Sequence, residues 1–377
     1  MNDRDSSSAA TAAAATTPLF ALTLAEAEAR VAELGGRAVH VRALRRAALR
    51  RGARELGEAL ETGVALPAGL LARMRAAGLV ASSSHPVASA PAGDGSQKLG
   101  LRLADGRTVE CVVLPAEKGL HSVCVSSQVG CPVGCPFCAS GVGGLVRNLA
   151  AHEIVEQFAH ARAVADVRRA VVMGIGEPLL NFENVVAALD VVVAEMGLAP
   201  TRLVISSVGF PERVRRLAAS GRRFGLAISL HAVGDDLRER LVPMMKGVLV
   251  RDVVAAARAW AEATRGRVQF EYVVLAGVND DLAAVDELAR LVGGFPSYVN
   301  FIPWNRVEGM DFAPPDEARV VALVRRAREL GLVATRRRTL GDAAAAACGQ
   351  LRRGLEGARA AEPPRVTSPP SRPRPPS

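Results

Sequence analysis

Short apolar runs alternate with longer segments of mixed polarity along the chain from residue 121 onward. In the longer segments apolar residues recur every three or four positions, which predicts helices at 151–164, 184–196, 212–219, 250–263 and 281–292. The short runs predict strands at 121–126, 170–173, 203–206, 226–230, 268–274 and 298–302. Such alternation is typical of a parallel sheet built from βα units. Six units are too few to close an eight-stranded barrel, so we expect an α/β fold with an open partial barrel, (β/α)6.

A helical pattern also covers residues 24–80, with one of its helices expected at 68–77. Five arginines in this region recur at three- and four-residue steps and share one helix face: Arg42, Arg45, Arg46, Arg50 and Arg54. Such a face is either solvated or in contact with phosphate groups, and the pattern alone leaves both interpretations open. A hairpin is predicted further along, with strands at 99–104 and 109–114 around the turn Asp105-Gly106.

These patterns divide the chain into five parts. We expect a disordered tail at 1–22, a small helical N-terminal domain at 23–81, and a linker rich in Ser, Pro, Gly and Ala at 82–97. The main domain spans 98–351. The proline-rich segment 358–377 is expected to be a second disordered tail, because proline disrupts both helices and sheets.

Composition excludes several classes of protein. Six cysteines in 377 residues are too few for a secreted scaffold held by disulfides, and the polar N-terminus lacks the pattern of a signal peptide. No segment approaches the roughly 18 apolar residues of a membrane span. We therefore expect a cytoplasmic protein with free thiols and no membrane contact. The net charge of +9 is compatible with a nucleic-acid partner, although the few aromatic residues argue against binding by extensive base stacking.

The strongest chemical signal is a cluster of three cysteines, Cys131, Cys135 and Cys138, in the spacing C-x3-C-x2-C. Three thiolates are one short of the four that complete a tetrahedral zinc site or a [4Fe–4S] cluster. Zinc with a distant fourth ligand is one interpretation. The other is a [4Fe–4S] cluster with one open iron, which the amino and carboxylate groups of S-adenosylmethionine could chelate. The spacing favours the cluster and S-adenosylmethionine as cofactors.

Polar motifs follow the predicted strands at their carboxyl ends, where barrel enzymes build their active sites. The cysteine loop follows the first strand, and four further motifs follow later strands: Gly174-Ile-Gly176-Glu177-Pro178, Ser206-Ser207, Ser229-Leu230-His231 and Pro303-Trp304-Asn305. The glycine-rich turn is not a dinucleotide-binding fingerprint, because it lacks the third glycine of that motif and a proline interrupts the start of its helix. Five such motifs on one rim predict a single site.

These motifs together resemble the RlmN/Cfr family of radical S-adenosylmethionine RNA methyltransferases. The resemblance extends from about residue 98 to residue 351 and is weaker over 25–80. Besides the cysteine loop, its matching stretches are 124–131, 147–149, 174–181, 229–232, 271–273, 302–305 and 347–351. It implies a radical-SAM barrel with a [4Fe–4S] cluster and S-adenosylmethionine.

The resemblance also implies a reaction on an adenine ring carbon. Such a carbon is electron-poor and cannot attack a sulfonium methyl group, so a radical route is needed. In the family, one S-adenosylmethionine methylates a cysteine, here Cys348, and a second gives a 5′-deoxyadenosyl radical that removes a hydrogen from that methyl group. The methylene radical adds to adenine. The other cysteine, here Cys124, then attacks the sulfur of Cys348, releasing methylated RNA and leaving a transient disulfide.

Site residues follow from the resemblance position by position. Cys131, Cys135 and Cys138 are the expected cluster ligands, and Glu110 is the expected base that removes the adenine proton. Two residues are expected to contact the methionine amino group, Gly176 and Glu177. The rest of the cofactor pocket is expected to comprise Ser206, Ser229, Leu230, His231 and Asn305. Cys111 matches no family function and is interpreted as structural.

The implied substrate is an adenosine in 23S rRNA, in tRNA or in both, methylated at C2 rather than C8. The expected partners are RNA and an external electron donor such as flavodoxin or ferredoxin, and the protein is expected to be a monomer. Leu340 stands where the family has arginine, and the segments at 206–209 and 231–235 also depart from its pattern. A divergent member acting on another RNA is therefore an alternative.

Two further alternatives are an RNA-binding iron–sulfur or zinc protein without catalysis and a radical enzyme acting on a small molecule. The presence of Glu110, Cys124 and Cys348 favours the methyltransferase, because a binding protein needs none of them.

Overall fold

The computed structural model describes residues 16–52, 55–57, 64–92, 95–116, 119–307 and 309–337. Residues 1–15 and the predicted tail at 358–377 lie outside these ranges, as do Arg54, Leu340 and Cys348. None of the helices in the described ranges is long and apolar enough to span a membrane.

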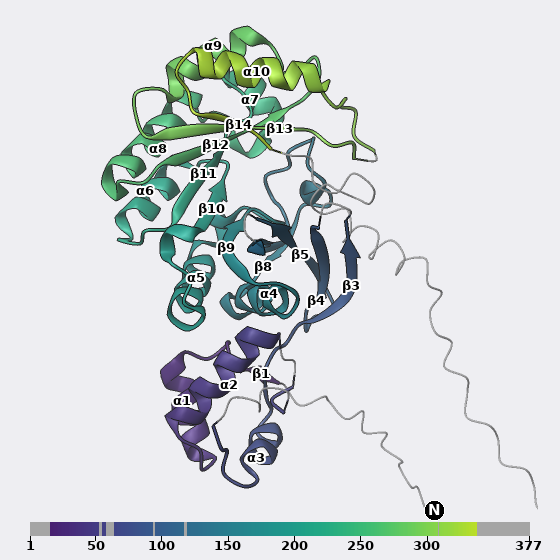
Figure 1. Ribbon diagram of the computed structural model, residues 1–377, viewed down its shortest axis with the longest axis vertical. Coiled ribbons are helices and arrows are strands. Elements are labelled where there is room, and N and C mark those ends of the chain that lie inside the picture. The colour runs from purple at the N-terminus through teal and green to yellow at the C-terminus, as the bar shows by residue number, and fades with distance from the viewer. Residues whose placement is uncertain are drawn as a thin grey trace, which may run out of the picture.

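The described chain folds around one twisted sheet of ten strands in the order β14-β13-β12-β11-β10-β9-β6-β5-β4-β3 (Figure 1). Its parallel part contains the six predicted strands, β6 (His121–Val125), β9 (Val167–Val172), β10 (Leu203–Ser207), β11 (Gly225–Ser229), β12 (Val268–Val274) and β13 (Ser297–Pro303). A short strand not predicted from the sequence, β14 (Ala334–Arg336), extends this part beyond β13. The α/β class and the open partial barrel are confirmed.

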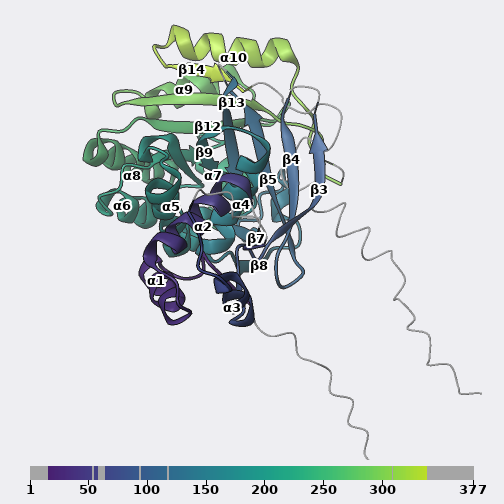
Figure 2. The ribbon, with the colours of Figure 1, turned by 60° about the horizontal axis from the view of Figure 1, so that its bottom comes forward.

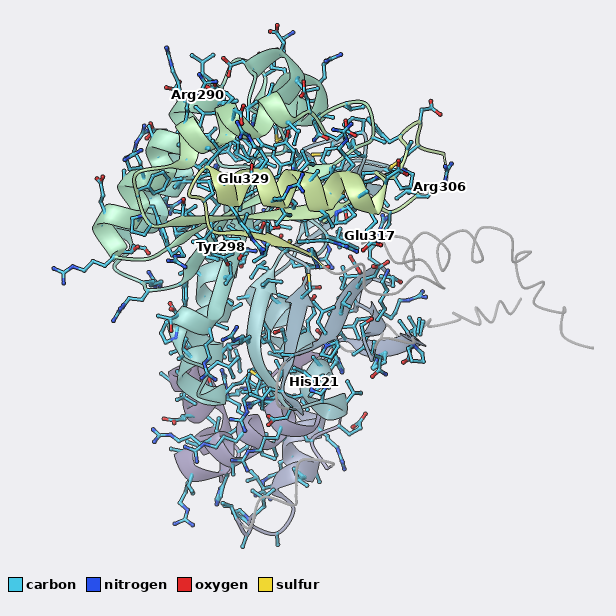
Figure 3. All side chains as sticks on the ribbon, turned by 45° about the horizontal axis from the view of Figure 1, so that its top comes forward. His121, Arg290, Tyr298, Arg306, Glu317 and Glu329 are labelled. Atoms are coloured by element: carbon cyan, nitrogen blue, oxygen red, sulfur yellow. The ribbon has the colours of Figure 1, made fainter. Side chains whose placement is uncertain are left out.

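Helices cover the outer face of the parallel strands (Figure 1). They are α4 (Ala151–Val164), α5 (Phe182–Met196), α6 (Pro211–Ala219), α7 (Asp235–Leu241), α8 (Val250–Thr264), α9 (Leu282–Val292) and α10 (Glu317–Glu329). Each predicted helix forms because one apolar face packs inward: α8, for example, buries Val253 and Trp260. The charged side chains of Arg290 on α9 and Glu329 on α10 lie on the outer helical layer (Figure 3).

The hairpin predicted around Asp105-Gly106 forms as β4 (Gln97–Arg102) and β5 (Thr108–Pro115), and it joins the main sheet beside β6. The expected linker at 82–97 is different in the structure, because it contains an edge strand, β3 (His85–Pro91), paired antiparallel with β4. Prolines are tolerated in edge strands because one side of such a strand needs no partner. The small and polar composition of 82–97 therefore concealed a strand.

The N-terminal part contains α1 (Leu24–Glu33), α2 (Ala38–Arg51) and α3 (Leu70–Ala76), and α2 lies against α4 and α5 (Figure 2). The described end of the expected disordered tail at 1–22, residues 16–22, is ordered in the structure. β1 (Thr17–Pro18) pairs with β2 (Leu79–Val80), and Leu19 and Phe20 are buried. Burial of these two apolar side chains explains why the segment is ordered there.

The arginine face of α2 is divided between two environments. Arg45 is 1% exposed, forms a bidentate pair with Glu195 of α5 at 2.7 and 2.8 Å, and donates to the carbonyls of Leu19 and Leu22. Arg42 pairs with Glu28 at the surface. Arg45 therefore anchors the N-terminal helices to the barrel and does not contact phosphate groups.

Replacing Arg45 with methionine should destabilise the fold by about 3–5 kcal/mol, because Glu195 and two carbonyls would lose their partner at a buried interface. Denaturant unfolding monitored by circular dichroism measures this change. Arg42→Met is the matched control on the same helix, and its exposed pair should contribute at most about 1 kcal/mol. Equal losses in the two variants would contradict the anchoring role of Arg45.

Candidate active site at the carboxyl edge of the barrel

The cysteine loop is enclosed by a small antiparallel ribbon, β7 (Gln128–Gly130) and β8 (Leu145–Asn148). Gly130 has a positive φ of 78°, and a Cβ atom there would lie 2.0 Å from the carbonyl oxygen of Gly144. Only glycine fits this close approach. The loop turns tightly after it, and the Cys138 amide donates to the Cys135 carbonyl at 3.1 Å.

The three thiols of the loop share a partly buried environment. Burial raises the pKa of Cys131 to about 12 and that of Cys135 well above its usual value, and neighbouring Cys138 raises both further. Thiolates held so close together require a strongly cationic partner. No three His, Cys, Asp or Glu side chains in the described ranges converge on a point where one metal ion could bind. Neighbouring thiols such as Cys131 and Cys135, whose pKa values are raised, suit metal ligation, because a bound cation is what stabilises them as thiolates.

Two later strand ends hold the cysteine loop in place. The indole Nε1 of Trp304, just after β13, donates to the Phe137 carbonyl at 2.8 Å. The Phe137 ring meets the His231 ring edge to face, with centroids 5.2 Å apart. Asn305 follows Trp304 and is half-buried at the same rim. These contacts place the predicted cofactor residues His231 and Asn305 next to residues that contact the cluster loop.

His231 lies directly after Leu230 in a left-handed conformation, with φ of 63°. Its Nδ1 accepts a hydrogen bond from the Val273 amide at 3.1 Å, and its carbonyl accepts one from Asn279 at 2.8 Å. Burial lowers the pKa of His231 to about 3, so the ring is neutral and its proton is assigned to Nε2. This histidine therefore offers a neutral N–H group rather than a charge.

The turn after β9 brings Glu177 into the centre of the rim. A Cβ atom at Gly176, whose φ is 114°, would lie 2.7 Å from Gln128. The buried Glu177 carboxylate accepts from the amides of Leu179 at 3.0 Å and Val208 at 2.9 Å. Burial nevertheless raises its pKa to about 6. The Ser207 side chain also donates to this carboxylate, which leaves one of its four lone-pair positions to accept from a bound ammonium group.

The two other cofactor positions on strands lie beside these turns. Ser206 on β10 pairs in register with Ala227, and Ser229 on β11 pairs with Glu271. Leu230 is fully buried, its amide donates to the Glu271 carbonyl at 3.0 Å, and its carbonyl accepts from Arg238 at 3.2 Å.

Strand alternation separates the two remaining described cysteines. Val112 on β5 lies opposite Cys124 on β6, so Glu110 and Cys124 are diagonal neighbours on one face of the sheet, about 7–8 Å apart between backbones. Both are buried, at 3% and 4% exposed. Cys111 points to the opposite face, where its sulfur lies 3.9 Å from the Gln157 carbonyl of α4. That position fits the structural interpretation of Cys111.

Sequence reasoning missed a polar ladder on the inner face of β12, β13 and β14. Asn300 donates to the buried Glu271 carboxylate at 2.9 Å, Gln269 also donates to it, and Thr335 donates to Asn300 at 3.1 Å. Burial raises the pKa of Glu271, while Arg337 opposes this shift. The sequence does contain a pattern that indicates this ladder, because Gln269 and Glu271 interrupt an otherwise apolar strand at alternate positions.

Comparisons with known proteins agree with this geometry. Residues 125–289 match the model of the radical SAM superfamily. A probable dual-specificity RNA methyltransferase RlmN of Gloeobacter violaceus is 41% identical over 343 residues, covering 90% of this chain and 96% of the relative. A relative of the same name from Thermosynechococcus vestitus is 43% identical over 69% of this chain and 77% of its own length. The crystal structure of a radical SAM methyltransferase from Sphaerobacter thermophilus superposes with a TM-score of 0.82 at 36% identity, covering 89% of this chain and 98% of that one.

The family match, the long relatives and the cysteine loop agree on one assignment. The chain belongs to the RlmN family of radical SAM RNA methyltransferases, enzymes that use S-adenosylmethionine and a [4Fe–4S] cluster.

Proposed function

We propose that this RNA methyltransferase methylates C2 of an adenosine in 23S rRNA, in tRNA or in both, through a methylated Cys348. The observation that carries the proposal is that Glu110 and Cys124 are buried diagonal neighbours on the inner face of the sheet, at the same rim as the cysteine loop. A base and a thiol in one buried place suit a reaction in which a ring proton leaves and a carbon–sulfur bond is broken. The relatives named as dual-specificity RNA methyltransferases support two kinds of RNA substrate.

The roles of the chain's own residues follow from their positions. Glu110 removes the proton from the adenine carbon after that carbon has bonded to the methylene group on Cys348, and the one electron that the adduct radical also has to lose would pass to the cluster when it is bound. Cys124 then forms a bond to the Cys348 sulfur as the sulfur–carbon bond to RNA breaks, and the released carbon takes up a proton. Cys348 itself lies outside the described residues. When bound, the cluster and S-adenosylmethionine supply the radical chemistry that an electron-poor ring carbon requires.

The cofactor pocket is proposed to use the predicted rim residues. Cys131, Cys135 and Cys138 hold the cluster, and the Glu177 carboxylate, with the backbone of Gly176, binds the methionine ammonium group. Around the rest of the ligand lie Ser206, Ser229, Leu230, His231 and Asn305. The neutral His231 suits a site that has to bind a cation, because a protonated ring there would repel the sulfonium of S-adenosylmethionine.

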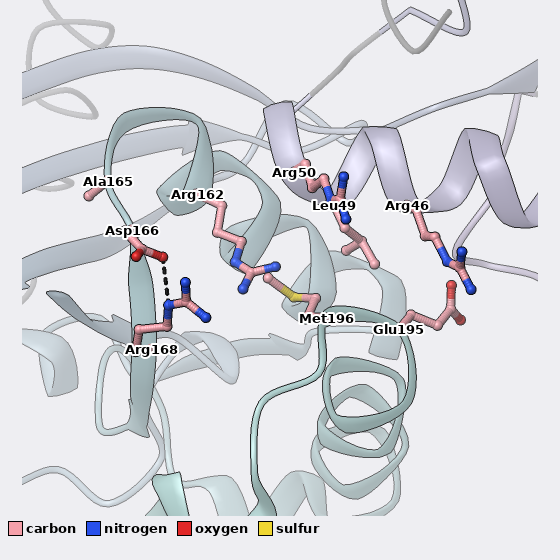
Figure 4. Close-up of a pocket in the computed structure, with 9 residues that line it drawn as sticks. All are labelled: Arg46, Leu49, Arg50, Arg162, Ala165, Asp166, Arg168, Glu195 and Met196. Carbon is pink, nitrogen blue, oxygen red and sulfur yellow. Dashed lines mark ion pairs between the residues drawn. The ribbon is translucent and has the colours of Figure 1, made fainter. Parts of the chain in front are cut away.

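We also propose that the N-terminal helices form an RNA-binding accessory unit, with a basic cleft as its contact surface. The cleft has a volume of about 580 Å³ and lies between α2 and the ends of α4 and α5 (Figure 4). Four arginines line it: Arg46, Arg50, Arg162 and Arg168. Among the described lining residues, only Asp166, paired with Arg168 at 2.8 Å, and Glu195, already held by Arg45, oppose their charge. Burial, together with neighbouring Arg168 and Arg50, lowers the pKa of Arg162, as expected where cations lack anions.

The cleft lies at the amino ends of the strands, beside the start of β9, and thus on the opposite edge from the cysteine loop. A 14-residue helix such as α4 spans about 21 Å, so one RNA must extend over at least that length to reach both places. A folded hairpin or tRNA does so. The remaining proposed features are a monomeric enzyme and an external low-potential electron donor.

A divergent member acting on another RNA is the second candidate, because Leu340 and the segments 206–209 and 231–235 depart from the family pattern. In the structure the segment 206–209 holds Val208, whose amide bonds to Glu177, so changes in this segment affect the cofactor side of the rim and not a surface open to RNA. That location favours an unchanged reaction.

The product identifies the reaction. Purified enzyme, incubated anaerobically with S-adenosylmethionine, a reductant and either 23S rRNA or tRNA, should yield 2-methyladenosine on nucleoside mass spectrometry. Synthetic 2-methyladenosine and 8-methyladenosine serve as chromatographic standards. Exclusive formation of the 8-methyl product would overturn the C2 assignment, and methylation of neither RNA would favour the divergent alternative.

Alanine variants of Cys124 and Cys348 should lose methyltransferase activity in different ways. Cys124→Ala should accumulate a covalent protein–RNA species, because the carrier still adds to adenine but the link is not resolved. It is detected as an RNase-sensitive band on a denaturing gel. Cys348→Ala and the double variant should show no such band, and Cys111→Ala, the control from the outer face, should still turn over. Adduct-free inactivity in both single variants would indicate two structural cysteines.

Neutralising the cleft should weaken RNA binding without weakening the fold. In Arg50→Gln/Arg162→Gln, the slope of log K against log salt should fall by about 1–2, as expected for one or two lost phosphate contacts. The melting temperature should stay the same or rise, since like charges are relieved. The control pair Arg251→Gln/Arg325→Gln removes two exposed, loosely paired arginines elsewhere. An unchanged slope in the cleft variant would mean that these arginines are only solvated.

A further inference from the structure

Arg238 on α7 is buried beside the rim, with a side chain 1% exposed. Its Nε donates to the Leu230 carbonyl at 3.2 Å and its Nη2 to the Val208 carbonyl at 2.5 Å. Its Nη1 is also buried, and no group in the described ranges accepts a hydrogen bond from it. A buried guanidinium with an unsatisfied N–H is costly, so a reason for this arrangement has to be sought in the site.

The anions around Arg238 are few. Burial lowers its pKa to about 10, and Cys135 is the strongest of the groups that oppose this shift, ahead of Asp235. The Asp235 carboxylate already accepts from the Val250 amide at 2.7 Å. Arg238 and Cys135 therefore lie within range of electrostatic interaction, which places the guanidinium close to the cysteine loop.

The backbone confirms that α7 and the cysteine loop are neighbours. Directly after α7, a short 3-10 turn (Pro243–Met245) reaches the loop, where the Met244 amide donates to the Val133 carbonyl at 3.4 Å. The two carbonyls that Arg238 binds belong to the ends of β10 and β11, and Val208 also holds Glu177. Arg238 thus joins two strand ends of the cofactor pocket and lies beside the third element, the cysteine loop.

We propose that Arg238 is a positioning residue that holds a permanent positive charge, with its Nη1–H free to donate, against the Cys135 side of the iron–sulfur cluster. This inference rests on the cluster ligation by Cys131, Cys135 and Cys138 proposed above. The proposed positive charge affects the reduction of the cluster. One electron from a low-potential donor adds negative charge to an assembly whose thiolates are already anionic, and no proton needs to move. A nearby buried cation and a hydrogen bond to a cluster sulfur both raise the reduction potential.

A merely structural role is the competing interpretation, because the two carbonyl bonds alone could justify an arginine. Two substitutions separate the roles. Arg238→Lys keeps the charge and Arg238→Gln removes it, while each can still donate to a carbonyl and neither reproduces the full set of bonds. Loss of structure should therefore be similar in the two variants, and only the electrostatic effect should differ.

The test uses full-length protein, reconstituted anaerobically with iron and sulfide. Iron content, melting temperature and the midpoint potential from an EPR-monitored redox titration are measured for wild type and both variants. We expect a more negative midpoint in Arg238→Gln and a midpoint close to wild type in Arg238→Lys. Cleavage of S-adenosylmethionine with dithionite, without RNA, should slow more in the glutamine variant. Equal midpoints in all three proteins, with lower melting temperatures in both variants, would overturn the proposal.

A measurement on the unsubstituted protein covers the case in which the variants do not fold. With arginine labelled by ¹⁵N, pulsed EPR of the reduced cluster should detect a hyperfine coupling to the guanidinium nitrogen. Absence of that coupling would also overturn the proposal. Wild-type protein that takes up no iron would instead refute the cluster ligation itself, so the two failures are distinguishable.

Discussion

Side-chain alternation along the parallel strands is the constraint on which the rest of this structure depends. Because successive residues point to opposite faces, each strand has to supply an apolar set to the helices outside and a second set to the barrel interior. On β12 this rule places Glu271 inside while Phe270 packs outside against Phe295, and the same alternation on the antiparallel strand β5 separates Glu110 from its neighbour Cys111. The interior can be polar only because the helical layer, closed by residues such as Trp260, already provides the core.

Buried charge is the second feature of the rim, and it is compensated mainly by backbone groups. Glu177 is stabilised by two amides, His231 is kept neutral by burial and held by the Val273 amide, and Arg238 is held by two carbonyls. Backbone partners cannot change their charge or swing away, so they fix the positions of these side chains before a ligand binds. Such preorganisation is what a radical enzyme requires, because a reactive group has to meet one hydrogen atom and no other.

The N-terminal helices illustrate how one helix face can serve two purposes. Arg45 is buried, where a bidentate ion pair and two backbone carbonyls replace its contacts with water. Arg46 and Arg50, one and five residues further on, instead line a cleft where arginines outnumber carboxylates. The first arrangement stabilises the interface with the barrel. The second does not serve stability, and for that reason it is the better candidate for contact with a polyanion.

Much of the architecture was determined by the sequence itself. Hydrophobic periodicity located the six parallel strands and the five predicted helices of the barrel, because apolar faces must be buried wherever they occur. The C-x3-C-x2-C spacing and the polar motifs after the strands indicated one rim and its cofactors, since carboxyl ends of parallel strands meet at one edge. The edge strand β3 and the ordered segment around Leu19 escaped prediction, because their order comes from partners distant in the chain.

The roles of several similar residues depend on tertiary contacts. In the sequence Arg45 and Arg46 are adjacent arginines, and Cys111 and Cys124 are both cysteines in apolar strands; burial, strand register and neighbouring carbonyls distinguish them. Arg238 carries no signal in the sequence at all, since its role depends on carbonyls of Val208 and Leu230 and on the approach of the Cys135 loop. Periodicity records which faces are buried, whereas the charge balance of a site depends on segments that only folding brings together.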